Sequence, residues 1–190
     1  MGITIIDRPL YPGQDYYGNG LTGVETMPRS DASNTAQATS SGVVRLTYFT
    51  PQVTYTATNA LTYVGATAAG ATPTLCKVGF YTVASNGDLT LVASTANTTS
   101  LWSGSVTTEY STALSASYTF IAGQRYAAAA LVVTGATAPT LMGGSGSASS
   151  ALNARAPRIS ASLSAQTDLP ASISSGSLTV NAVRHYVAAV

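Results

Sequence analysis

The sequence has few of the residues on which catalysis, metal binding and disulfide formation depend. Charged residues are only 8% of its 190 residues, against about a quarter in an average globular domain. The one cysteine, Cys76, excludes a disulfide within the chain and a zinc site built on cysteines. The formal net charge of +1 provides no general attraction to nucleic acid or to an anionic membrane.

The few titratable side chains form no catalytic motif in the sequence. A serine triad would have to use the one histidine, His185, and no G-x-S-x-G nucleophile elbow accompanies it. The acidic residues after residue 42 are Asp88, Glu109 and Asp168, and their spacing indicates neither a carboxylate pair for glycoside hydrolysis nor a calcium loop. We therefore expect no enzymatic activity, no cofactor and no metal ion, and we interpret His185 as a packed or surface side chain.

Targeting signals are missing as well. The start, MGITIIDRPL, reaches Asp7 and Pro9 before an apolar region of signal-peptide length can form. Residues 126–142 are uncharged, but Gly135 and Pro139 interrupt them, and the stretch is too short to cross a bilayer as a helix. We expect a protein made in the cytoplasm, with no signal peptide and no membrane insertion.

One stretch matches a nucleotide-binding motif in its letters only. Residues 18–23, GNGLTG, read G-x-G-x-x-G, which binds a pyrophosphate when a buried strand precedes it and a helix follows. Here Pro9 and Pro12 interrupt the preceding residues, and Pro28 follows without any apolar period of 3.6 residues. We interpret the glycines as part of an extended segment that passes close to a partner surface.

What the sequence has in quantity is the composition of β-strands. Threonine and valine are frequent and there are eleven tyrosines, and β-branched and aromatic residues favour strands. From Val43 on, short runs are separated by turn residues at the spacing of sandwiches and barrels, and SVTTEYSTAL and SYTFIAG count as two of them. Asn86-Gly87 between two runs indicates a hairpin. Cys76 has the position of a thiol buried in a strand, and residues 125–133, RYAAAALVV, indicate a buried strand.

These features divide the chain into two parts. Residues 1–41 contain three prolines, many glycines and the polar stretch SDASNTAQATSSG, so we expect an extended N-terminal arm and linker. Residues 42–190 are expected to form one antiparallel β-sandwich, which makes the fold class all-β. So little charge leaves apolar faces and strand edges exposed in a monomer, so we expect an oligomer or a larger assembly.

Aromatic residues are the candidates for binding. Tyr11, Tyr16 and Tyr17 lie in the arm, where tyrosine supplies contact area to a partner protein at low entropic cost. Trp102, in TTSLWSGS, has two interpretations, which are contact with a sugar ring and packing in the sandwich core.

Several segments of the body resemble a known family. The most specific are RLTYFT, ATPTLCKVG with LTLVAST, and AGQRYA, which together span about residues 43–134, and the similarity is weaker from there to residue 190. They resemble a domain that recurs in virion proteins of tailed phages infecting actinobacteria, commonly as the C-terminal part of minor tail proteins. The chain differs from many such fibres in having only the 41-residue arm in front of this domain.

This resemblance implies a jelly-roll-like sandwich without enzymatic activity that assembles on the virion, often as a homotrimer. The function expected from it is that of a structural protein of a tailed-phage virion, a minor tail or other surface subunit attached through its N-terminal arm. Two alternatives stay open: a capsid (head) decoration protein that stabilises the shell, and an adhesin that binds a host cell-wall glycan.

Overall fold

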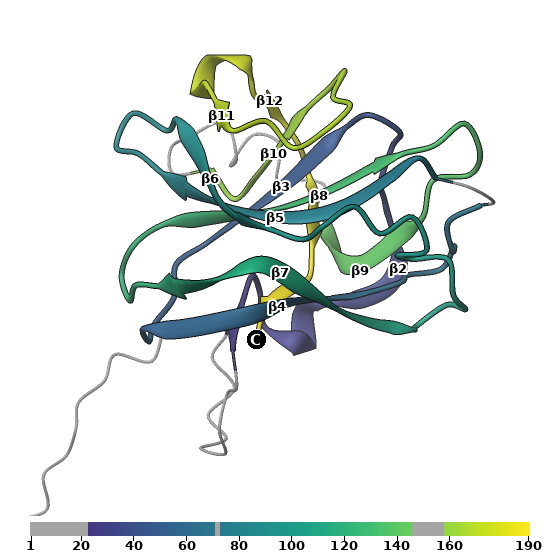
Figure 1. The fold of residues 1–190 in the computed structure, drawn as a ribbon, viewed down its shortest axis with the longest axis horizontal. Helices are drawn as coiled ribbons and strands as arrows, with labels where there is room; N and C mark the ends of the chain where they lie inside the picture. The colour runs from purple at the N-terminus through teal and green to yellow at the C-terminus, as the bar shows by residue number, and fades with distance from the viewer. Residues whose placement is uncertain (1–22, 71–72, 146–157) are drawn as a thin grey trace, which may run out of the picture.

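The computed structural model describes residues 23–70, 73–145 and 158–190 (Figure 1). Almost all of its regular structure is β. The strands are β1 (Val24–Glu25), β2 (Ser33–Ala38), β3 (Val44–Phe49), β4 (Tyr55–Tyr63), β5 (Leu75–Val83), β6 (Leu89–Ser94), β7 (Glu109–Phe120), β8 (Tyr126–Val133), β9 (Thr140–Ser145), β10 (Ser160–Leu163), β11 (Ser172–Ile173), β12 (Thr179–Val180), β13 (Val183–His185) and β14 (Val187–Ala189). Two short 3-10 turns are η1 (Arg29–Asp31) and η2 (Ser175–Ser177).

The strands form an antiparallel sandwich of two main sheets with a third, smaller sheet beside them. One main sheet has the order β11-β6-β5-β8-β3-β10-β12 and the other the order β1-β14-β4-β7. Figure 1 shows the first above the second, and the chain passes between them on the way from β3 to β4, from β4 to β5, from β6 to β7 and from β7 to β8. The third sheet has the order β13-β9-β2. The prediction of a single all-β, antiparallel sandwich is confirmed.

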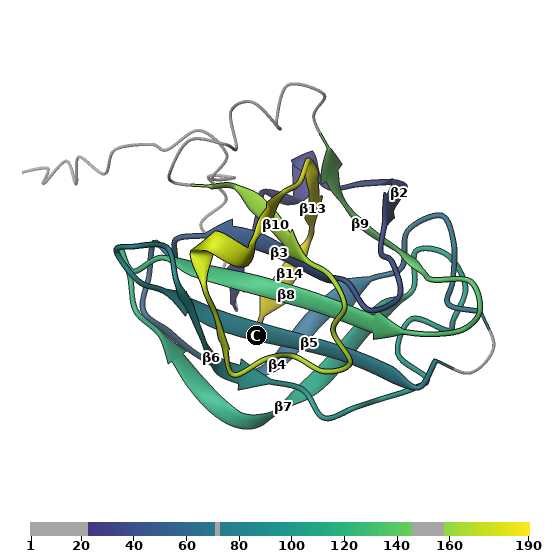
Figure 2. The same cartoon turned by 90° about the horizontal axis from the view of Figure 1, so that it is seen from above.

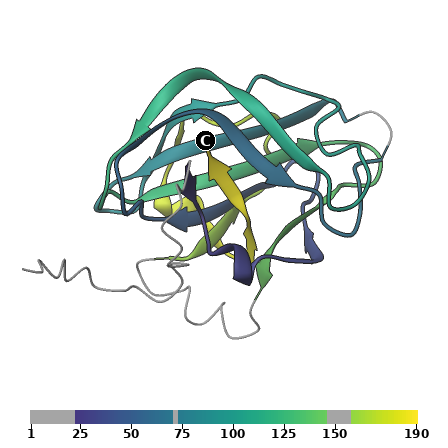
Figure 3. The ribbon, with the colours of Figure 1, turned by 90° about the horizontal axis from the view of Figure 1, so that it is seen from below.

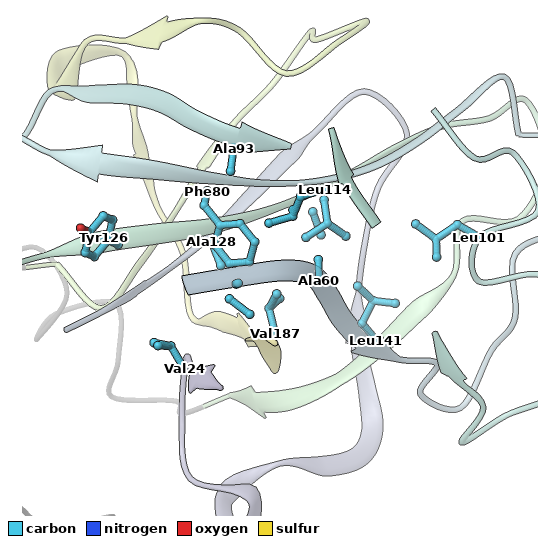
Figure 4. Close-up of a cluster of buried hydrophobic side chains, with 14 of the residues drawn as sticks. Val24, Ala60, Phe80, Ala93, Leu101, Leu114, Tyr126, Ala128, Leu141 and Val187 are labelled. Atoms are coloured by element: carbon cyan, nitrogen blue, oxygen red, sulfur yellow. The ribbon is translucent and has the colours of Figure 1, made fainter. Parts of the chain in front are cut away.

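The main core lies between the two large sheets, and strand β8 shows how it is built. Ala128, Ala130 and Val132 point into this core, next to side chains such as Phe80 and Val187 from both sheets (Figure 4). The residues between them point to the other face of the same sheet. A strand buried on both faces needs small or apolar side chains at every position, which the run of four alanines, residues 127–130, provides.

The second face of the seven-stranded sheet is covered by residues 164–182. Leu169, Ile173 and Leu178 of this segment pack against the sheet in a second apolar cluster, and Figure 2 shows the segment crossing over β8 and β5. The Lys77 ammonium on β5 lies 2.8 and 2.9 Å from the two carboxylate oxygens of Asp168, which attaches the segment at its start. The sandwich is therefore layered on both sides of its central sheet.

The predicted hairpin is confirmed, while two predicted strands prove to be one. Strands β5 and β6 pair antiparallel on either side of a turn in which Gly87 has φ 86°, a left-handed backbone that glycine adopts without strain. The runs SVTTEYSTAL and SYTFIAG contribute to a single strand, β7, of 12 residues. Its register with β4 shifts between Ala57 and Asn59, so a bulge in β7 takes up the residues that resembled a break.

The boundary predicted at residue 41 is wrong for the residues that the structure describes. Strand β1 pairs with β14, the last strand, and β2 pairs with β9, and Figure 3 shows β1 in purple beside β14 in yellow. At Gly23 a Cβ atom would lie 2.6 Å from the Ala189 carbonyl oxygen, so the close approach that its glycine permits is to its own chain. Residues 24–38 thus belong to the sandwich, because distant strands supply the hydrogen bonds that their own sequence cannot.

This pairing predicts which part of the chain resists protease. Limited digestion of the purified protein is expected to leave a folded core that still contains residues 24–41, because strands β1 and β2 are hydrogen-bonded into two sheets. N-terminal sequencing and mass spectrometry of the resistant fragment measure its first residue. A stable fragment that begins near Val43 would show that β1 and β2 are not part of the cooperative unit.

Candidate functional site

The three tyrosines expected to contact a partner, Tyr11, Tyr16 and Tyr17, lie outside the described residues, so their role stays a prediction. The described part of the chain begins at Gly23, the last residue of the glycine motif at positions 18–23. From there on, the residues that bear on function lie on the four-stranded sheet and around it.

Trp102 does not contact a sugar ring, because none of its surface is exposed. It lies between β6 and β7 with 0% exposure and packs in the main core. Its indole Nε1 donates a hydrogen bond to the Thr62 hydroxyl at 2.9 Å, and its backbone has φ 67°, a left-handed conformation that is strained for a non-glycine residue. The core interpretation of Trp102 is correct and the glycan interpretation is wrong.

His185 is a packed histidine, as one interpretation of the sequence held. Its side chain is 1% exposed, and its Nε2 atom lies 3.3 Å from the Gln37 carbonyl oxygen. A carbonyl only accepts, so Nε2 carries the proton and donates. Nδ1 has no partner among the described residues. Burial, together with the positive charge of Arg45, lowers the pKa of His185 to about 4, so the ring is neutral at neutral pH.

The thiol of Cys76 is buried in β5, which confirms its interpretation as a strand residue. Burial raises its pKa to about 11. The thiolate, which is the reactive form of cysteine, is therefore scarce near neutral pH.

The three acidic residues of the body lie in three different environments. The Asp88 carboxylate accepts a hydrogen bond from the Ser175 backbone N–H at 2.7 Å, Asp168 pairs with Lys77, and Glu109 pairs with Tyr63. In the described ranges no three His, Cys, Asp or Glu side chains are grouped so that they could hold a metal ion. Within the described ranges, no helix is long and apolar enough to cross a membrane.

A hollow on the outside of the four-stranded sheet is the candidate binding site. It has a volume of about 170 Å³ and is lined by Arg29, Ala32, Tyr63, Met142 and Tyr186; we call it the tyrosine hollow. These residues come from η1 and the residue that follows it, from β4, from β9 and from the link between β13 and β14. The sandwich therefore has to be fully assembled before the hollow exists.

Two aromatic rings and one ion pair define the tyrosine hollow. The ring centroids of Tyr63 and Tyr186 are 5.8 Å apart at 57°, and Tyr186 is nearly buried while Tyr63 is partly exposed. The Arg29 guanidinium lies at the rim and donates from Nε to the Glu25 carboxylate at 2.7 Å. Burial and the hydrogen bond to Glu109 raise the pKa of Tyr63 to about 12, so its hydroxyl stays protonated.

The hollow continues into a row of polar side chains along β4 and β7. Three hydrogen bonds between side chains cross from one strand to the other, and we call them the polar ladder. They join Tyr63 to Glu109, Asn59 to Ser111, and Thr56 to Thr119. The side chains that alternate with them, such as Ala60, point into the core. The ladder therefore lies on the outer face of the sheet, with the hollow at one end.

This arrangement is equipped to hold a ligand by contact and hydrogen bonding. It presents an aromatic wall, a guanidinium, a carboxylate, an amide and hydroxyl groups on one exposed face. Sequence analysis did not find the site, because Tyr63 and Tyr186 are distant in the chain and neither stands in a motif. An aromatic residue at the end of an alternating run was the one local signal.

Comparison with known proteins identifies no family for the chain. No family model matches it, and a search of curated proteins finds no match. The resemblance to phage virion domains therefore stays a prediction from the segments that carry it.

The hydrogen bond of Trp102 yields a stability prediction. Thr62→Val keeps the shape of a side chain that is 1% exposed but removes the acceptor of the indole N–H. Leaving this donor buried without a partner is expected to lower the free energy of unfolding by about 1–3 kcal/mol. Urea denaturation measures the change. Thr90→Val on β6, where the threonine is exposed, is the control and should change stability by less than about 0.5 kcal/mol; equal effects of the two changes would contradict the assigned hydrogen bond.

His185 predicts how stability depends on pH. Its pKa is lowered from 6.5 to about 4 in the folded protein, so the unfolded chain takes up a proton first as the pH falls. The contribution of His185 to the free energy of unfolding is then constant above about pH 7. It decreases between pH 6.5 and 4, by about 2 kcal/mol between pH 7 and 5. Urea denaturation at both pH values is expected to show that His185→Gln lacks this part of the decrease. Identical pH dependence in the two proteins would mean that the folded protein accepts the proton on His185.

Proposed function

We propose that the protein is a structural subunit of a tailed-phage virion, a minor tail or other surface subunit that attaches through its N-terminal segment. Residues 1–22 take the place of the longer arm expected from the sequence, because residues 24–38 belong to the sandwich. The segment carries Tyr11, Tyr16 and Tyr17. Three tyrosines in one short segment supply the rigid aromatic contacts that interfaces favour.

The observation that carries the proposal is the attachment of the segment to the sandwich. β1 pairs with the last strand, β14, through Val24↔Ala189 and Glu25↔Ala188, and Gly23 lies against the same strand. Any force on the N-terminal segment is thus transmitted directly into a sheet rather than into a loop. A subunit attached to a large particle through this segment requires such an anchor.

Further support comes from the surface at one end of the sandwich. Val53 and Ile121 are 44% and 45% exposed, and the loops that carry them are joined by a hydrogen bond from the Gly123 N–H to the Pro51 carbonyl at 2.9 Å. Exposed apolar side chains on adjacent loops favour contact with a neighbouring chain. With 8% charged residues, the protein has little charge to oppose association, and the family resemblance implies a homotrimer.

Changing Tyr11, Tyr16 and Tyr17 together to alanine tests the attachment. The triple variant is expected to keep its oligomeric state and thermal midpoint but to stop sedimenting with virions. Truncating a buried interface tyrosine costs about 2 kcal/mol or more, and three such losses exceed what a peripheral subunit can lose. Light scattering, thermal unfolding and immunoblots of purified particles provide the three measurements.

The matched control changes the same three tyrosines to phenylalanine, which keeps the rings and should preserve incorporation. A stable alanine variant that is still fully incorporated would show that the protein attaches elsewhere. Counting copies per particle separates the locations: a handful favours the tail and hundreds favour a decoration protein of the head.

A further inference from the structure

We propose that the tyrosine hollow and the polar ladder together form a binding site for an uncharged oligosaccharide. This site lies on the described residues alone and does not depend on how the protein attaches to a particle. It replaces Trp102, whose ring is fully buried, as the place of contact with a sugar. The proposal follows from the shape of the hollow, the hydrogen-bonding groups of the ladder and the charge around both.

The hollow has the size and the wall for one sugar ring. Its volume of about 170 Å³ is similar to that of a cavity of about 150 Å³ that takes up one benzene-sized ring. The partly exposed ring of Tyr63, supported by Tyr186 at 5.8 Å, forms an aromatic wall. The face of such a ring is electron-rich, and the C–H groups on one side of a pyranose ring are polarised positive by the neighbouring oxygens. A pyranose therefore suits this wall better than an aliphatic chain does.

The ladder supplies both donors and acceptors, as sugar hydroxyls require. Asn59 uses one amide hydrogen on Ser111 at 3.0 Å and retains a second hydrogen and a carbonyl oxygen. Ser111 accepts that bond and can still donate. The Glu109 carboxylate accepts from the Tyr63 hydroxyl and has further lone pairs free for a ligand. The internal hydrogen bonds hold these groups in place before a ligand arrives, which lowers the entropic cost of binding.

The extent of the face indicates a chain of sugars rather than one. From Tyr63 to Thr56 the outer face of β4 runs along seven residue steps, about 23 Å at the rise of a strand. Thr56, Ser111, Glu109 and Thr119 are all exposed along this length. β7 is the edge strand of its sheet, so an extended ligand can lie along the ladder with one ring in the hollow.

Charge selects against acidic glycans. Among the described residues, the charges that act on Tyr63 are the carboxylates of Glu109 and Glu25 and the guanidinium of Arg29, which is already paired with Glu25 at 2.6 Å. These three described side chains together carry a net charge of minus one. Uronic acids and phosphate-bearing sugars would be repelled by Glu109, whereas neutral hexoses, pentoses and N-acetylhexosamines bring hydroxyl and amide groups that it can accept from.

A glycan microarray with the purified full chain tests the proposal. Its probes are neutral oligomers (maltohexaose, chitotetraose and arabinogalactan fragments) and acidic oligomers of galacturonic acid. Binding is expected to at least one neutral oligomer and to none of the acidic ones. Ala113→Lys places a long side chain on the outer face beside Asn59 and Ser111 and should lower the affinity at least about tenfold. Glu109→Gln, at an exposed position, removes a charged acceptor and should weaken binding by about the same factor.

The matched control is Ala84→Lys, which adds the same side chain at an exposed position after β5 and should bind like the unchanged protein. All three variants are expected to keep the thermal midpoint, and Glu109→Gln decides the test if the strand position does not accept lysine. Absence of binding to every neutral oligomer, binding only to acidic ones, or full binding by both site variants would each overturn the proposal. The measurement contains no particles, so its failure leaves the virion proposal untouched, and failed incorporation leaves this one untouched.

Discussion

Burial of strand β8 on both of its faces is the constraint on which the rest of the structure depends. Its even-numbered residues from Tyr126 to Val132 face the core between the sheets, and the odd-numbered residues between them face the covering segment, residues 164–182. The four alanines at 127–130 are small, so the layers on both sides of β8 pack closely against it and no polar side chain would fit at these positions. The remaining strands of the central sheet follow outward from β8, through β5 on one side and β3 on the other. The segment 164–182 returns over the sheet and buries the odd-numbered side chains of β8.

A core of this kind confines polar chemistry to the outside. Several buried polar groups hold the fold together: the Thr62 hydroxyl accepts from the Trp102 indole, the Thr47 hydroxyl accepts from the His185 backbone N–H, and His185 Nε2 bonds to the Gln37 carbonyl. Polar groups that a ligand can reach are found on the outer face of β4 and β7, where Thr56, Glu109 and Ser111 are exposed. There the cross-strand side-chain bonds stabilise the sheet and also place hydrogen-bonding groups in a row, so one set of contacts serves both the fold and the proposed site.

The N-terminal attachment and the proposed glycan site share a sheet. β1, which holds the base of the N-terminal segment, and β4, which carries Tyr63, lie on either side of β14. Arg29 and Ala32, which line the hollow, directly follow β1 in the chain. The proposed attachment segment and the proposed ligand site are thus neighbours in one sheet, separated by the single strand β14. β7 lies at the edge of this sheet opposite β1, so a subunit held through β1 would have the β7 edge away from its point of attachment.

The amino-acid sequence by itself determined the all-β class, the hairpin at Asn86-Gly87, the doubly buried strand and the packed state of Cys76. These depend on turn chemistry and on alternation between near neighbours in the chain, which sequence patterns record directly. Only the tertiary structure decided that residues 24–38 belong to the sandwich, that Trp102 is inaccessible, and that Tyr63 and Tyr186 form one hollow. Each of these results from pairing between strands far apart in the sequence, such as β1 with β14, and no local pattern specifies which distant strand will supply the hydrogen bonds.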